Sequence, residues 1–447
     1  MSLCPVCLER IPARRVCHTN HEVFLEKECP VHGRFSTRTW NGPPDFLAWA
    51  RPKIPFYPLA PLTQTDQGCP FDCGLCPGHR QRSCTILLEV THRCNLACPV
   101  CFAGAGPMHT ADPGQDTIAG WFETAWKSGG NCNIQISGGE PTLRDDLPDI
   151  ISLGRETGFS FIQLNTNGLR MARDPGLAPS LARAGLDSVF LQFDGLDDGV
   201  YTKLRGRPLL AEKIQVLNTV RDCGLGVVLV PTLVPGVNTG QVGQILEFAM
   251  KWSPTVRAVH FQPISYFGRY PEKPDASLRF TLPELMQAIG EQTNGLFRAD
   301  HFRPPGCENA WCSFHGNFMI TSGSSVIPLG DSGVRPCCGE PARAELGADR
   351  AIAGVARQWA APQAAIEPRD NPMAYRPAQG PMSMDDFLAQ ARTHCLAVSA
   401  MAFQDAWTLD LERVRDCCIH VMSPDNRLIP FCLYNLTGAG GRSLYRP

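Results

Sequence analysis

The residues of this sequence that can do chemistry are above all its 21 cysteines. One loop, Thr91-His-Arg-Cys94-Asn-Leu-Ala-Cys98-Pro-Val-Cys101-Phe102, separates three thiols by gaps of three and two residues. This spacing lets one short loop direct three thiolates to three irons of a [4Fe–4S] cubane, and the fourth iron then has no protein ligand. An iron with an open position can bind a cofactor or substrate, as an open zinc position does. Structural zinc sites usually take cysteines in pairs, so the trio favours a cluster.

Two short knuckles near the N-terminus predict a different kind of metal site. Cys4-Pro-Val-Cys7 is followed by Cys29-Pro-Val-His32, and the four side chains suit tetrahedral zinc or a rubredoxin-like iron. Cys17 is an alternative to His32 as the fourth ligand. The ligands do not decide between the two metals. We expect the metal to fold a small module that buries too little surface unaided.

A second cysteine-rich stretch is a rival for the open cluster. Cys69-Pro-Phe-Asp-Cys73-Gly-Leu-Cys76 repeats the three-and-two spacing, and Cys84 follows it. Cys84 can fill the fourth position, which predicts a closed auxiliary [4Fe–4S] cluster over residues 69–84. The loop at 94–101 is the stronger candidate for the open cluster because it directly follows a β-like run, whereas 69–76 has no clear preceding strand.

The C-terminal third carries the remaining clustered cysteines. We expect another auxiliary cluster there, held by Cys312, Cys417, Cys418 and Cys432, with Cys307 or Cys337 as further candidates. Adjacent cysteines rarely both bind one cubane, so one of Cys417 and Cys418 is a candidate for a cysteine that does not bind the cluster. Three other thiols stand in apolar or isolated settings and are predicted to be ordinary buried cysteines: Cys132, Cys223 and Cys395.

Small and polar residues recur where β-like runs end. Ser137-Gly138-Gly139-Glu140-Pro141-Thr142 follows one run; its paired glycines allow close approach of a ligand, and Glu140 places a carboxylate beside them. Asn165-Thr-Asn167-Gly follows the next run and Asp194-Gly the one after. Ordinary turn chemistry accounts equally well for the Asn-Gly and Asp-Gly pairs taken alone.

The elements that must position these residues alternate between strand and helix. β-like runs are expected at 85–90, 133–136, 161–164, 188–193, 226–233 and 258–262, and helical spacing marks 209–222 and 242–252. This order predicts an α/β fold with parallel βαβ units. We interpret it as a partial (β/α)6 TIM-like barrel with its function at the carboxyl ends of the strands. A doubly wound sheet is the alternative.

The domain organisation follows from changes in texture along the chain. We expect an N-terminal metal module over 1–60, an auxiliary-cluster segment over 61–84, the barrel over 85–300 and a C-terminal cluster-binding extension over 301–447. Residues 340–380, rich in Ala, Pro and Arg, are expected to form a variable loop or linker.

Composition narrows the class of protein. Apolar residues make up 43% and charged residues 19% of the chain, which predicts a sizeable folded core. The net charge of −2 with scattered basic residues gives no footprint for nucleic acid. No signal peptide or membrane-spanning run stands out, so a cytoplasmic enzyme is expected. A secreted disulfide protein fits badly because closely bunched cysteines favour metal binding.

The three-cysteine loop, with Phe102 beside its last thiol, and the Gly-Gly-Glu-Pro turn resemble the radical S-adenosylmethionine (SAM) superfamily. The resemblance implies that the open iron binds the amino and carboxylate groups of SAM. Reductive cleavage of the bound SAM then gives a 5′-deoxyadenosyl radical, which abstracts hydrogen from an unreactive carbon. It also implies that the turn 138–141 holds the methionine end and that Asn165, Asn167 and Asp194 line the strand-end site. A flavodoxin or ferredoxin is the expected reductant.

The order of motifs resembles, over essentially the whole chain, a group that contains archaeal tetraether lipid synthase and dihydro-hydroxymethylpterin dimethyltransferases. The resemblance implies one mononuclear metal, two auxiliary clusters and chemistry at an unactivated sp³ carbon. One branch joins lipid chain ends, which could bring the enzyme to a membrane surface; the other methylates a pterin from a folate-like donor. A peptide- or cofactor-modifying radical enzyme and a non-catalytic electron-transfer protein are the alternatives, because family membership does not fix the substrate.

Overall fold

The computed structural model describes residues 1–446 except 19–20, 107–110, 272–273, 276–278, 322–324, 330–340 and 363–382. At its centre six strands pair in parallel and in chain order. They are β7 (Thr85–Thr91), β8 (Asn133–Gly138), β9 (Ile162–Thr166), β10 (Ser188–Gln192), β11 (Gly226–Val230) and β13 (Val256–Pro263). A doubly wound sheet reverses its strand order midway. These six strands never reverse, so the predicted barrel-like α/β fold is confirmed.

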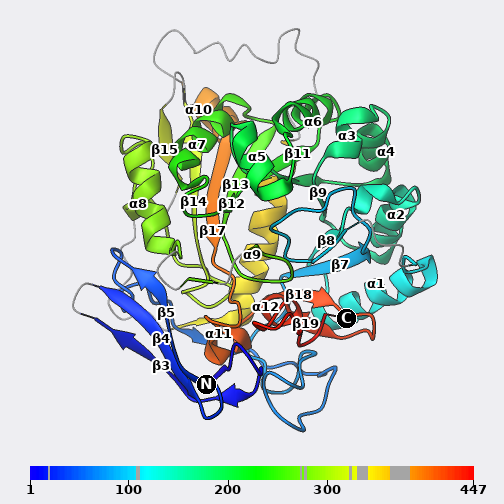
Figure 1. Cartoon of the computed structure of the whole chain (residues 1–447). Coiled ribbons are helices and arrows are strands. Elements are labelled where there is room, and N and C mark those ends of the chain that lie inside the picture. Colours follow the sequence, from blue (N-terminus) through cyan, green and yellow to red (C-terminus); the bar gives the residue numbers. More distant parts are fainter. Residues whose placement is uncertain are drawn as a thin grey trace.

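Helices cover the outer face of this sheet (Figure 1). They are α1 (Gln115–Gly129), α2 (Leu147–Thr157), α3 (Leu169–Arg173), α4 (Leu177–Ala184), α5 (Asp198–Arg205), α6 (Leu210–Asp222), α7 (Val242–Lys251) and α8 (Leu282–Gln292). Helix α6 shows why they form: Val216, Leu217 and Val220 recur at helical spacing and are all buried. The expected helices at 209–222 and 242–252 agree with α6 and α7 to within one residue.

The chain beyond residue 300 extends the sheet at both edges. On one side β17 (Cys395–Met401) pairs in parallel with β13, followed by β14 (Ser313–Ile320) and β15 (Val326–Pro328). On the other side β18 (Ile419–Met422) pairs in parallel with β7 and in antiparallel with β19 (Leu428–Pro430). The path from β15 to β19 does not close on itself, so the barrel is partial.

Helix α9 (Ala344–Trp359) crosses the middle of the molecule (Figure 1) and contacts β11, β13 and β17. Three shorter helices complete this part of the chain: α10 (Met384–Thr393), α11 (Leu411–Arg415) and α12 (Phe431–Tyr434). Gly347 lets α9 approach the chain at Gly306, because a Cβ at Gly347 would lie 2.0 Å from the Gly306 carbonyl oxygen. The loop or linker expected over 340–380 is wrong for residues 344–359, which form this helix, and residues 363–382 lie outside the described residues.

The N-terminal strands form a small antiparallel module at one end of the molecule (Figure 1). Its strands are β1 (Ser2–Leu3), β2 (Arg10–Ile11), β3 (Ala13–Cys17), β4 (Glu22–Cys29) and β5 (Gly33–Asn41), and the short β6 (Lys53–Ile54) pairs with β16 (Ala342–Arg343). Buried Lys27 anchors it, since its Nζ donates to the carbonyl oxygens of Leu3 and Ala406 at 2.8 and 2.6 Å. Within the described residues, no helix has both the length and the apolarity needed to cross a bilayer.

Candidate active site and metal centres

A cavity of about 620 Å³ lies on the inner side of the sheet. This volume falls within the range of about 300–1,000 Å³ usual for small-molecule sites. The thiols of Cys94, Cys98 and Cys101 line one part of it, and residues of α9 line another. The three cysteines lie together on the cavity wall and thus fit a cluster with an open side, which is the donor set expected for a [4Fe–4S] site.

Two arginines hold the cysteine loop in place. Arg269 donates to the carbonyl oxygens of Cys98 and Ala105, both at 2.7 Å, and Arg205 donates to the carbonyl oxygen of Val100 at 3.0 Å. Burial raises the pKa of the Cys94 thiol to about 12. A coordinated metal reverses this preference, because a thiol that binds a metal is deprotonated. Neither arginine has a local sequence pattern that would have indicated this role.

The paired glycines pack directly on the chain that leads into the cysteine loop. A Cβ at Gly138 would lie 2.1 Å from the Thr91 carbonyl oxygen, and one at Gly139 would lie 2.2 Å from the Arg93 carbonyl oxygen. The Gly139 N–H donates to that Thr91 oxygen at 2.8 Å. Both glycines also line the cavity. No larger residue fits here without moving the cysteine loop.

The carboxylate of Glu140 accepts hydrogen bonds from neighbouring groups of the protein. It is 1% exposed and accepts from the Thr142 N–H and hydroxyl, the Thr166 hydroxyl and the Asn167 N–H, at 2.6–3.1 Å. Asn165 and Asn167 reach the cavity wall, as does Phe102, whereas the cavity lining includes neither Glu140 nor Pro141. The structure therefore gives Glu140 a joining role between the ends of β8 and β9.

Asp194 is likewise enclosed behind the cavity wall. It is fully buried and accepts from Arg205 Nε and Nη2, both at 2.7 Å, and from the Thr232 N–H at 3.1 Å. Since Arg205 also holds Val100, the carboxylate connects the end of β10 to the cysteine loop. The sequence placed Asp194 correctly at a strand end but gave no sign of its arginine partner.

Three rings gather in another part of the cavity. Phe190, His260 and Trp359 lie with ring centroids 5.7–6.0 Å apart, and all three line the cavity. Burial lowers the pKa of His260 to about 4, so its ring is neutral at physiological pH, and Nδ1 lies 2.8 Å from the Ser399 hydroxyl. These residues come from β10, β13 and α9, and sequence spacing alone could not have shown that they meet.

Amide side chains face the same space. Gln135, Asn165 and Gln192 line the cavity from β8, β9 and β10. The Asn165 Nδ2 donates to the Ser137 hydroxyl at 3.3 Å, whereas its Oδ1 is buried and accepts no hydrogen bond from any described residue. A buried acceptor without a donor is costly, and a ligand N–H can supply the missing bond.

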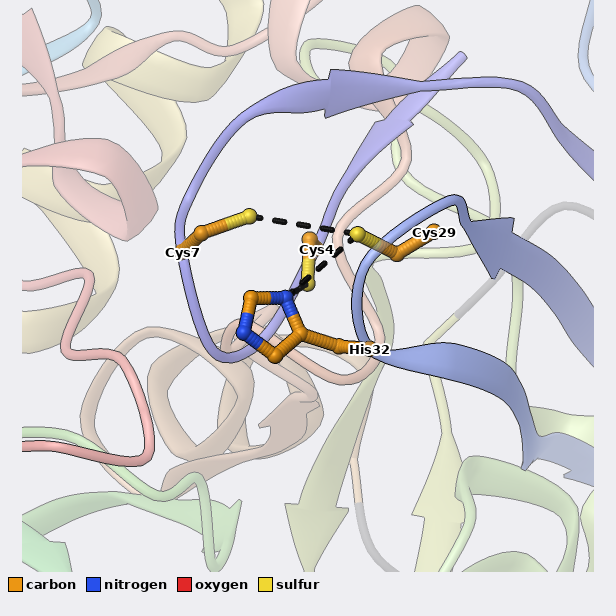
Figure 2. Close-up of side chains that lie close together, drawn as sticks. All are labelled: Cys4, Cys7, Cys29 and His32. Atoms are coloured by element: carbon orange, nitrogen blue, oxygen red, sulfur yellow. Dashed lines mark hydrogen bonds between the residues drawn. The ribbon is translucent and has the colours of Figure 1, made fainter.

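The N-terminal knuckles form a compact four-ligand site (Figure 2). The ligand atoms of Cys4, Cys7, Cys29 and His32 all lie within 4.8 Å of one another. His32 Nδ1 is 3.6 Å from Cys4 Sγ and 3.5 Å from Cys29 Sγ. Cys17, the alternative fourth ligand, lies at the end of β3 and is exposed. The geometry suits one tetrahedral ion.

The other cysteines are grouped differently from the sequence-based expectation. Cys84 lies with Cys307 and Cys418, and their ligand atoms all lie within 4.8 Å of one another. Pairing of β18 with β7 causes this, because the Cys84 N–H donates to the Cys418 carbonyl oxygen at 2.8 Å. Spacing along the chain had placed Cys84 with residues 69–76 and Cys418 with Cys432.

Two further thiol groups remain. Cys312, Cys417 and Cys432 line a small cavity of about 30 Å³ together with Arg413, whose Nε and Nη2 donate to Cys312 Sγ at 3.4 Å. Cys69 and Cys73 interact through their side chains, which lowers the pKa of Cys69 and raises that of Cys73. Cys76 is buried, and Cys337 lies outside the described residues. Cys132, Cys223 and Cys395 belong to none of these groups.

Comparison with known proteins gives two family matches and several relatives. Residues 88–249 match the Radical SAM superfamily, and residues 1–41 match the HMPTM N-terminal zinc ribbon domain. The chain is 32% identical to 7,8-dihydro-6-hydroxymethylpterin dimethyltransferase of Methanocaldococcus jannaschii over 97% of this chain and 92% of that protein. It is 27% identical to PqqA peptide cyclase of Streptomyces rochei over 56% of this chain and 68% of that one. The solved structure of Streptococcus suis SuiB covers 48% of this chain and 47% of its own at 15% identity, with a TM-score of 0.40.

Proposed function

This chain belongs to the radical SAM superfamily, in the group of the 7,8-dihydro-6-hydroxymethylpterin dimethyltransferase, and we propose that it methylates a carbon of a small, flat heterocycle of pterin type. One observation carries the proposal: the cavity that the radical-loop thiols line also holds the Phe190–His260–Trp359 rings and several amides. Aromatic faces stack on flat rings. Amides match the donors and acceptors at the edge of such a ring.

In this proposal each part of the site has a distinct task. Cys94, Cys98 and Cys101 hold the [4Fe–4S] cluster, and Gly138 and Gly139 let the methionine end of SAM approach the backbone. A reduced cluster bound there would supply the electron for cleavage of SAM to methionine and a 5′-deoxyadenosyl radical. The electron comes from a flavodoxin- or ferredoxin-type partner.

The chain's own residues then fix the geometry of the reaction. Glu140 and Asp194 are positioning residues, since their carboxylates join the strand ends to one another and to the cysteine loop. The rings of His260 and Trp359 hold the substrate plane, and the free Asn165 Oδ1 accepts an N–H from its edge. The substrate C–H becomes C–CH₃, and the abstracted hydrogen ends in 5′-deoxyadenosine. The methyl–nitrogen bond of a methylfolate-type donor breaks, and a second electron from the reductant with a proton from solvent releases the demethylated donor. Cys69, Cys73 and Cys76, and separately Cys312, Cys417 and Cys432, are proposed auxiliary-cluster ligands.

A lipid chain fits this cavity less well than a heterocycle does. A saturated chain offers no donor to the buried Asn165 Oδ1, and leaving this acceptor unpaired costs binding energy. Such polar groups lower the affinity for apolar ligands and raise it for ligands that pair them. The lining therefore favours the pterin branch over chain coupling.

The test is an anaerobic reaction of the reconstituted, reduced protein with SAM, a methylfolate-type donor and one of three substrates: a dihydropterin, an archaeal-type lipid or a peptide. We expect 5′-deoxyadenosine formation to be stimulated by the pterin, with a methylated pterin found by mass spectrometry. Trp359→Leu should raise the pterin KM, whereas Trp126→Leu, on the outer helix α1, should not. Stimulation by the lipid or the peptide instead of the pterin would overturn the proposal.

A further inference from the structure

The sulfurs of Cys84, Cys307 and Cys418 lie closer together than those of the radical loop. Among the described residues, two groups bring at least three ligand atoms within 4.8 Å of one another: this group and the N-terminal ribbon site. Cys94, Cys98 and Cys101 are also described residues, but their sulfurs are not all within 4.8 Å of one another. The sulfurs of Cys84, Cys307 and Cys418 are therefore as close together as the ligand atoms of the ribbon site.

Bond lengths explain why this scale matters. Zinc–thiolate bonds of about 2.3 Å in a tetrahedron hold neighbouring sulfurs about 3.8 Å apart. In a cubane the cysteine sulfurs bind different irons, so bridging sulfides and metal atoms hold them farther apart. Cys84 Sγ and Cys418 Sγ are only 3.1 Å apart, which is near the one-metal distance.

A carboxylate lies beside the three thiols but outside the group whose ligand atoms are all within 4.8 Å of one another. Glu308 Oε2 lies 3.6 Å from Cys418 Sγ, and Oε1 accepts from the Ser313 hydroxyl, which orients the group. The main chain here is held by Lys53, whose Nζ donates to the Cys307 carbonyl oxygen at 2.5 Å. Glu308 lines the large cavity together with the three thiols. Three thiolate sulfurs are ligands that a divalent zinc ion accepts, and an exchangeable ligand can take the fourth position.

We propose that Cys84, Cys307 and Cys418 bind one mononuclear zinc-type ion in the wall of the cavity, separate from the ribbon metal and from the clusters. The ion joins three segments far apart in the sequence. Two of them, at Cys84 and Cys418, meet where β7 pairs with β18. The existence of this centre does not depend on which substrate the enzyme methylates.

Metal counting tests the proposal without an activity assay. Protein purified anaerobically from medium containing zinc and iron should hold about two zinc ions per chain, one in the ribbon and one here. Cys29→Ser and Cys307→Ala should each lose about one zinc ion, with iron and acid-labile sulfide unchanged in Cys307→Ala. Cys132→Ala is the matched control, because this buried thiol lies near Cys84 but outside the group, and it should lose none.

Three results would overturn the proposal. A loss of iron and sulfide together in Cys307→Ala would assign these thiols to a cluster. A wild-type protein with one zinc ion, lost entirely in Cys29→Ser, would leave no zinc for this site even if Cys307→Ala does not fold. Equal loss of zinc in Cys132→Ala and Cys307→Ala would show that the loss does not depend on these three thiols.

Discussion

Replacing Arg205 by methionine should detach the cysteine loop from the barrel, because a buried ion pair loses one partner. The Arg205 and Asp194 side chains are 6% and 0% exposed. Without the guanidinium, Asp194 keeps only the Thr232 N–H as a donor to its carboxylate among the described residues. Removing one partner of a buried pair costs about 3–5 kcal/mol, and the lost bond to the Val100 carbonyl oxygen adds about 1 kcal/mol.

Urea unfolding of the anaerobically purified protein, followed by circular dichroism, measures this cost. Arg205→Met alone should lose about 4–6 kcal/mol of unfolding free energy, and Arg205→Met with Asp194→Leu should cost less than the sum of the single changes by about 1–3 kcal/mol. Arg298→Met is the matched control, because the Arg298–Asp300 pair is 57% and 68% exposed, so solvent screens it and its loss should change the unfolding free energy far less. Strict additivity, or a loss in Arg205→Met no larger than in the control, would refute the reasoning.

Three further changes test other parts of the site. Gly139→Ala would place a Cβ 2.2 Å from the Arg93 carbonyl oxygen and should lower iron per chain, whereas Gly240→Ala, with nothing within 4 Å, should not. Cys98→Ala should abolish 5′-deoxyadenosine formation and retain most iron; continued product would move the radical cluster to 69–76. The His260 pKa of about 4 lies below its unfolded value near 6.5, so its stabilisation, up to about 3 kcal/mol, is present above pH 6.5 and is lost as pH falls toward 4. His260→Gln should flatten that part of a stability–pH curve, and an unchanged slope would contradict the burial argument.

The sequence predicted those parts of the fold whose apolar pattern is contained in one short segment. The strand at 133–136 and the helix at 209–222 each carry their apolar period within one short segment, and the structure places both there. The position of α9 was not predictable, because its Trp359 is an ordinary apolar helix residue until β10 and β13 bring Phe190 and His260 beside it. Ring contacts of this kind depend on tertiary packing, which a single sequence does not display.

The same distinction applies to the cysteines. Cys4, Cys7, Cys29 and His32 were grouped correctly because each pair of ligands lies in or beside one tight turn, between β1 and β2 and between β4 and β5, and two such pairs make up a tetrahedral site. Cys84 was grouped with its sequence neighbours because nothing near it announces that β18 will pair with β7. Ligand sets within one loop can be predicted from spacing, and sets that span the sheet edge cannot.

The pairing of β18 with β7 also links metal binding to folding. The partial barrel leaves β7 without a neighbour from its own βαβ units on one side, and β18 covers this edge over three residue pairs, Ile419–Thr85 to Val421–Leu87. Such a short pairing closes a very long chain segment, so the entropy lost on closing this loop opposes the pairing. A metal ion bound by Cys84 and Cys418 would offset that cost, because ligands brought together only in the folded chain convert binding energy into folding energy. Removing the ion should therefore loosen the β7–β18 edge first, which hydrogen exchange at the Cys84 and Thr85 amides, both donors to the Cys418 carbonyl oxygen, would report. Unchanged hydrogen-exchange protection of these two amides in Cys307→Ala would show that metal binding does not stabilise the β7–β18 pairing.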